Sequence, residues 1–293
     1  MSALKTQGFS LLELLIVIVL LGIMAVGAGM LIARPIDAYS DQLRRQQLVD
    51  SAEMALRKIE VDIRRALPNS IRTVPTASGW ALEMINTVDG ARYRDEAGTG
   101  FSTDTDILTF GVAGDRQFNL LGRFTSLATN TYAGYRAVIY STSPETIYSD
   151  AALNNNPGII SSPAGLVLSL DPSGVEHQLT LPGLYRFNFE SPTQRLFIVD
   201  GPVSYICDSV NRLLTRFDGY SYQLNQSSVD SLAELSALGA AGGRVATQVG
   251  RCVIDYQPGS AQRGGLVTLD LSLTDDEGET IRLLHQVHVD NVP

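Results

Sequence analysis

The chain has 293 residues, which is enough for one or two domains. Hydrophobic residues make up 44% of it and charged residues 18%, a globular composition with material for a sizeable core. The formal net charge of −9 argues against a nucleic-acid-binding protein, because a phosphate backbone attracts clustered Lys and Arg.

An apolar run is the first predicted element. About 20 residues, Leu14 to Ala33, carry no charge, and a helix of that length spans ~30 Å, the hydrocarbon thickness of a bilayer. A cleaved secretory signal has a shorter apolar region, so we expect a membrane helix over residues 9–33. A plain uncleaved anchor is the alternative. Glu13 argues against it, because a carboxylate at bilayer depth costs roughly 2–3 kcal/mol and usually has a partner.

A short basic leader, residues 1–8, precedes this helix, and Lys5 favours its retention in the cytoplasm. Cleavage after Gly8 would give Phe9 a free α-amino group, which Glu13 could meet on its own chain or on a neighbour. The string GFSLLELL, which starts at Gly8, closely resembles the processing motif of type IV prepilins. This resemblance implies that a prepilin peptidase cuts after Gly8 and methylates Phe9. It also implies that Glu13 recognises the N-terminus of an adjacent subunit.

Helical spacing continues beyond Pro35. Residues 34–68 are predicted to form an amphipathic continuation of the stem helix, which ends near Pro68. Its apolar stripe is expected to pack on a globular domain and consists of Leu48, Ala52, Ala55, Leu56, Ile59, Ile63 and Leu67.

Residues 69–293 show short apolar segments separated by Gly, Pro, Asn and Asp, which predicts a β-rich extracytoplasmic domain and an α+β fold overall. A short helix is expected within residues 229–241 and loops over residues 114–134 and 141–165. The predicted strands are Trp80–Ile85, Asp106–Val112, Arg136–Tyr140, Leu166–Leu170, Leu184–Glu190, Leu196–Asp200, Val203–Cys207, Leu213–Phe217, Cys252–Tyr256, Leu266–Thr274 and Thr280–Val289.

The two cysteines are Cys207 and Cys252. With the leader held in the cytoplasm, the rest of the chain after the membrane helix faces an oxidising space, where two cysteines tend to pair. We expect a Cys207–Cys252 disulfide, and two free buried thiols are the alternative.

Sequence motifs for catalysis or cofactor binding are missing: HExxH, the P-loop, GxSxG and CxxC do not occur. His285 and His288 are three apart on a predicted strand and point to opposite faces, so they would not share a metal. We therefore expect no enzyme, no catalytic residue, no cofactor and no metal. Acidic turns at residues 104–106 and 275–277 leave calcium open as an alternative, although Asp favours turns for local backbone reasons.

Later segments narrow the resemblance. Residues 60–72 (EVDIRRALPNSIR) resemble the stem end of minor pilins in the PilW and pseudopilin J group. Residues 197–208 (FIVDGPVSYICD) and 214–220 (LTRFDGY) resemble the MshO family, minor pilins of the mannose-sensitive haemagglutinin (MSHA) pilus. The resemblance implies a minor subunit that primes or caps pilus assembly.

The implied partners are prepilin peptidase, other pilin subunits, the inner-membrane assembly machinery and membrane lipid, with no nucleic acid. The implied location is the bacterial inner membrane, crossed once, with the C-terminal domain in the periplasm, and later the pilus at the cell surface. Two alternatives remain open: a minor pseudopilin of type II secretion, and an adhesive binding module displayed on the stem.

Overall fold

The computed structural model describes residues 10–96, 106–172, 174–259 and 264–291, and over residues 28–38 it describes the backbone alone. The chain divides into two compact units, Met1–Asp50 and Ser51–Pro293. One helix, α1 (Leu11–Arg64), begins in the first unit and ends in the second, and Pro35 does not interrupt it. The predicted stem helix is thus confirmed over residues 11–64, and the predicted division of the stem at residue 33 stays a prediction.

The end of α1 is set by hydrogen bonds to β2 (Gly79–Arg92). The Leu67 N–H donates to the Ile85 carbonyl at 2.8 Å, and the Thr87 N–H donates to the Arg65 carbonyl at 2.9 Å. These bonds draw the chain out of the helix before Pro68, because the backbone groups that would continue the helical ladder are used elsewhere. The stripe residues of the last turns, from Ala52 to Leu67, are buried.

The central sheet of the Ser51–Pro293 unit is antiparallel and has six strands. Its order is β1-β2-β8-β9-β10, and β5 pairs with the first half of β8. The strands are β1 (Arg72–Thr76), β2 (Gly79–Arg92), β5 (Arg136–Val138), β8 (Arg195–Asp208), β9 (Leu213–Asp218) and β10 (Ala241–Thr247). On one face α3 (Leu232–Ala237) contributes Leu235 to a buried cluster that also contains Ile206 and Tyr220.

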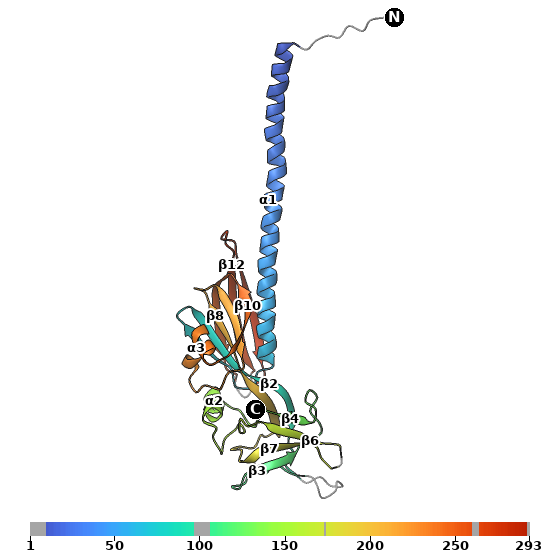
Figure 1. The fold of residues 1–293 in the computed structure, drawn as a ribbon, viewed down its shortest axis with the longest axis vertical. Helices are drawn as coiled ribbons and strands as arrows, with labels where there is room; N and C mark the ends of the chain where they lie inside the picture. Colours follow the sequence, from blue (N-terminus) through green and yellow to red (C-terminus); the bar gives the residue numbers. More distant parts are fainter. Residues whose placement is uncertain (1–9, 97–105, 173, 260–263, 292–293) are drawn as a thin grey trace, which may run out of the picture. The chain divides into compact units, whose positions relative to one another are not determined.

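A second antiparallel sheet contains β11 (Val249–Gln257), β12 (Gly265–Thr274) and β13 (Thr280–Val289) in that order. The predicted C-terminal hairpin is therefore confirmed. Its turn is held by Asp275, whose carboxylate accepts the N–H groups of Glu277 at 3.0 Å and Glu279 at 2.7 Å. The last turns of α1 lie beside this sheet, as the 2.9 Å contact between Glu60 Oε2 and His285 Nε2 shows (Figure 1).

A third sheet lies at the end of the same unit that is away from β12 (Figure 1). Its order is β3-β7-β6-β4, with β3 (Asp115–Asn119), β4 (Asn130–Tyr132), β6 (Leu166–Leu170) and β7 (His177–Tyr185). A buried cluster joins it to the first half of β8, since Phe118, Leu168 and Leu179 share that cluster with Leu196 and Ile198. The hydrophobic core of this unit is therefore spread over several clusters.

One predicted strand is absent, and others have different bounds. Residues 106–112 form no strand, because the Asp106 carbonyl accepts from Asn119 while the Leu108 N–H donates to Arg94, two different segments. The strand predicted over residues 184–190 ends at Tyr185. The two strands predicted around Gly201 are one strand, β8, because a bulge opposite Thr87 and a positive φ of 149° at Gly201 absorb the irregularity.

The sequence also predicted a loop where α2 (Pro144–Leu153) lies. Ser143 caps this helix by accepting the Thr146 N–H at 3.2 Å, Pro144 occupies its first turn, and Asn154 closes it in the left-handed conformation at φ 53°. These are ordinary start and stop signals. A 3₁₀ turn, η1 (Gln226–Ser228), precedes α3.

His177 at the start of β7 makes the stability of the fold depend on pH. Its Nδ1 accepts the Phe124 N–H at 3.0 Å, so the ring is neutral there. Burial lowers the pKa of His177, and the nearby Arg123 charge lowers it further. The Asp89 charge opposes this lowering. Since an unfolded His binds a proton near pH ~6.5 and the folded His177 only at lower pH, unfolding takes up a proton in that window. Stability is therefore lost as pH falls below ~6.5.

We expect His177→Asn, which keeps an acceptor near the Nδ1 position, to flatten this decline between pH ~6.5 and ~5 in urea unfolding. His288→Gln, at an exposed position of β13, is the matched control and should leave the slope unchanged. Identical pH profiles for wild type and His177→Asn would contradict the assignment.

Candidate functional site

The first turn of α1 contains Glu13, the residue that the sequence selects for assembly. The Glu13 N–H donates to Ser10 Oγ at 3.2 Å, and the Ser10 N–H donates back to Glu13 Oε2 at 3.2 Å. This reciprocal pair is a capping box, which satisfies N–H groups that a helix start leaves unpaired. Sequence reasoning missed this second role, although the Ser-x-x-Glu spacing indicates it. Gly8 and Phe9 lie outside the described residues, so the processing site stays a prediction.

Beyond this cap, the large apolar side chains of α1 from Leu11 to Val26 are exposed on every side of the helix. Exposed fractions of the large apolar residues from Leu11 to Val26 range from 83% at Leu11 to 44% at Val17. A helix with apolar residues all round is typical of a buried or membrane-inserted segment. Over the described part of the chain, no helix combines the length and the apolar character that crossing a membrane requires.

A polar cluster ties the last turns of α1 to the central sheet. Asp62 Oδ2 accepts a hydrogen bond from the Tyr205 hydroxyl at 2.7 Å and from Arg216 Nε at 2.6 Å. Arg216 also pairs with Asp218 on the same strand, β9. Burial alone would lower the pKa of Arg216, but the bonds to Asp62 and Asp218 raise it well above its usual value. The helix end is thus fixed on the sheet by charge-assisted bonds as well as by apolar packing.

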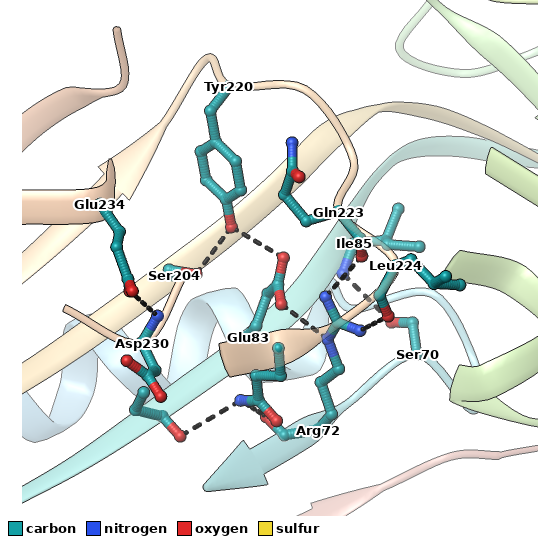
Figure 2. Close-up of polar contacts among 12 residues, drawn as sticks. Ser70, Arg72, Glu83, Ile85, Ser204, Tyr220, Gln223, Leu224, Asp230 and Glu234 are labelled. Atoms are coloured by element: carbon teal, nitrogen blue, oxygen red, sulfur yellow. Dashed lines mark hydrogen bonds and ion pairs between the residues drawn. The ribbon is translucent and has the colours of Figure 1, made fainter. Parts of the chain in front are cut away.

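A second polar network is almost fully buried beneath the loop that follows β9. Figure 2 shows Glu83 of β2 between Arg72 and Tyr220, with Ser204 on the other side of the Tyr220 hydroxyl. Glu83 Oε2 accepts from Arg72 Nε at 2.7 Å, Glu83 Oε1 accepts from Tyr220 at 3.0 Å, and Ser204 Oγ lies 2.6 Å from the Tyr220 oxygen. Only 1% of the Glu83 side chain is exposed.

The same network holds the loop itself. Arg72 donates to the carbonyl oxygens of Gln223 at 2.9 Å and Leu224 at 3.0 Å, and its guanidinium lies 3.6 Å over the Tyr148 ring (Figure 2 draws the hydrogen bonds). Burial raises the pKa of Glu83, and the Arg72 charge opposes that rise. Every charge in the network therefore has a partner, and its evident role is to fix β1, β2 and the 220–230 segment together.

The two cysteines are brought together by the packing of β8 and β11. Both side chains are buried and reduced. A hydrogen bond with Cys207, and next burial, raise the pKa of the Cys252 thiol well above its usual value. The pair predicted from the sequence therefore lies in direct contact, and the disulfide itself remains a prediction.

We expect the disulfide to form on oxidation and to raise the free energy of unfolding by roughly 4 kcal/mol, the chain-entropy value for a closed loop of about 46 residues. Urea unfolding with and without reductant measures this difference. Cys252→Ser is the control, since reductant should not change its unfolding midpoint. Two native thiols that both react with an alkylating agent after oxidation would contradict the expectation.

The histidines and acidic turns do not form a metal site among the described residues, which contain no group of three or more His, Cys, Asp or Glu with suitable placement. His285 contacts Glu60, whereas His288 is exposed on the opposite face of β13, as the sequence predicted. In the acidic turn at residues 275–277, Asp275 caps its own turn and Asp276 pairs with Arg212. In the other acidic turn, at residues 104–106, Asp104 lies outside the described residues.

One family model matches the chain. Residues 4–29 match the prokaryotic N-terminal methylation motif. No curated protein and no solved structure matches the chain. The matched segment contains Gly8, Phe9 and Glu13, so the N-terminus is that of a type IV pilin-like protein of a pilus or pseudopilus. The motif also implies processing by prepilin peptidase, membrane anchoring and assembly with other subunits.

Proposed function

We propose that this protein is a minor pilin that primes or caps assembly of a type IV pilus of the MSHA kind, as in the MshO family. The observation that carries the proposal is the methylation motif over residues 4–29, together with a helix whose large apolar side chains from Leu11 to Val26 are exposed and a large β-rich unit after it. The role is structural and needs no catalytic residue, cofactor or metal.

In this proposal the uncharged run from Leu14 to Ala33 lies in the inner membrane before assembly, with the β-rich unit in the periplasm. After cleavage, the same apolar surface packs against other subunits in the filament. Two features support this move from membrane to filament. Glu13 is exposed at the start of α1, although its carboxylate also caps the helix, and the contacts of Asp62 fix the end of α1 to the central sheet.

Mass spectrometry of the protein in assembled filaments tests this proposal. We expect the mature chain to begin at N-methylated Phe9. An intact Met1 in assembled material would overturn it. The subunits that co-purify distinguish a pilus from a type II secretion pseudopilus. Pilus subunits would support the MSHA-type role, and secretion subunits would assign the chain to a pseudopilus instead.

A further inference from the structure

A pocket of about 380 Å³ lies between the end of β7 and the segment that follows α2. Its wall includes Arg136 from β5, Asn154 at the end of α2, Ser162, and Gly183 and Tyr185 from β7. Small-molecule sites usually measure roughly 300–1,000 Å³, so this pocket has room for a ligand of about the size of a monosaccharide. Neither the stem helix nor the Glu83 network contributes to it.

Arg136 is the unusual member of this wall. The residue is 2% exposed, its Nη1 donates to the Ala151 carbonyl at 2.9 Å, and its Nε donates to the Ser161 carbonyl at 2.5 Å. Its Nη2 is buried and has no hydrogen-bond partner among the described residues. Both bonded acceptors are neutral carbonyls, and within the described residues no carboxylate lies at ion-pair distance from the guanidinium.

A buried cation without a counterion is costly, because low-dielectric surroundings replace its hydration. Asp150 gives Arg136 some electrostatic support, but its carboxylate is already bound to Asn155 Nδ2 at 2.7 Å and to the Ile159 N–H at 2.8 Å. Burial accordingly lowers the pKa of Arg136 despite the neighbouring Tyr222, Tyr185 and Asp150. The Tyr222 ring, whose centroid lies 5.4 Å from Arg136 Cζ, offers a cation–π contact but no negative charge. An anion in the pocket would supply that charge.

The rest of the wall combines apolar side chains, Leu181, Pro182 and Leu184, with preorganised polar groups. Asn156 Nδ2 donates to the Leu184 carbonyl at 3.1 Å, and the Tyr185 hydroxyl donates to the Asn155 carbonyl at 2.9 Å, so β7 and the loop are tied together. Asn154 is exposed at the rim, and Ser162 carries a hydroxyl in the wall. Amide and hydroxyl groups beside a cation suit a ligand that has several hydroxyls and one negative charge.

We propose that this pocket binds a small saccharide that carries a carboxylate, as a uronic acid does. The ligand carboxylate lies toward Arg136, whose charge acts across a wall with little solvent screening. Asn154 and Ser162 meet the ring hydroxyls. This activity is additional to filament assembly and would let the β-rich unit bind acidic surface polysaccharide.

The test uses the full chain in a non-ionic detergent without a sugar headgroup and measures glucuronate binding by calorimetry. Glucose is the matched neutral ligand, since it differs only in carrying a hydroxymethyl group in place of the carboxylate. We expect saturable glucuronate binding and at least ~10-fold weaker glucose binding. Absence of glucuronate binding, equal binding of glucose, or equally strong competition by acetate would each overturn the proposal.

Two variants avoid the folding risk of removing Arg136. Asn154→Asp keeps a residue type that tolerates the left-handed conformation and adds a negative charge at the rim, so glucuronate affinity should fall at least ~5-fold. Asn225→Asp, at an exposed position before η1, is the control and should bind like wild type. Gly183→Leu adds a side chain where a Cβ meets nothing within 4 Å, and it should abolish binding. If both pocket variants bind glucuronate with wild-type affinity, the proposed site is wrong. Pilus assembly by both variants should stay normal, because the pocket takes no part in it.

Discussion

Replacing Glu13 by Ala is expected to reduce incorporation of the protein into filaments ~100-fold or more, while cleavage after Gly8 continues. A carboxylate and an α-amino group 4 Å apart attract by ~4 kcal/mol at an effective dielectric constant of 20, and each 1.4 kcal/mol corresponds to roughly tenfold in an equilibrium constant. The variant loses that attraction to the N-terminus of a neighbouring subunit. Quantitative immunoblotting of sheared filaments against the membrane fraction measures the effect.

The capping box offers a competing explanation, which Ser10→Ala separates. Glu13 and Ser10 cap each other, so losing Glu13 also weakens the start of α1. Ser10→Ala removes the same cap, at a cost of about 1 kcal/mol, and keeps the Glu13 carboxylate. We expect Ser10→Ala to assemble nearly normally. If it fails as severely as Glu13→Ala, then helix capping rather than recognition of a neighbour explains the phenotype.

The stem and the C-terminal hairpin were predictable because their signals are local. The apolar stripe of α1 repeats at helical spacing, and the alternation along β12 places Val267, Leu269, Leu271 and Leu273 in the core, as the structure confirms. The strand predicted at Asp106–Val112 had a similar composition. It failed because strand formation depends on a neighbouring strand, which the sequence alone does not specify.

The polar sites depend even more than the strands do on which segments of the chain pair with one another. Arg72 lies opposite Glu83 only because β1 and β2 form a hairpin, and β1 was missed because Pro75 interrupts its apolar pattern. Arg136 lies on a strand that was predicted, yet its burial against Ala151 and Ser161 comes from packing with α2 and the loop after it. That Cys207 and Cys252 lie together was predictable, because the chain has just two cysteines.

The Glu83 network carries the largest expected effect on stability. Glu83→Ala leaves the Arg72 guanidinium without its carboxylate and leaves the Tyr220 hydroxyl with Ser204 alone. Removing one partner of a buried pair usually costs about 3–5 kcal/mol, because the remaining charge stays buried and uncompensated. Urea unfolding followed by tryptophan fluorescence measures the loss, since Trp80 lies on β2. Glu53→Ala is the control: its pair with Arg57 is exposed and worth less than about 1 kcal/mol.

We attribute the expected loss of stability in Glu83→Ala to the unpaired Arg72 charge. A double variant distinguishes this cause from the loss of side-chain packing. Glu83→Leu with Arg72→Met removes both charges and keeps apolar volume, although the Gln223 and Leu224 carbonyls lose their donor. We expect the double variant to be about 2 kcal/mol more stable than the sum of the two single variants predicts. Strict additivity would mean that Glu83 and Arg72 act independently, and the network would then be a set of separate contacts. Positive coupling would mean that it is one unit holding β1, β2 and the 220–230 segment in register.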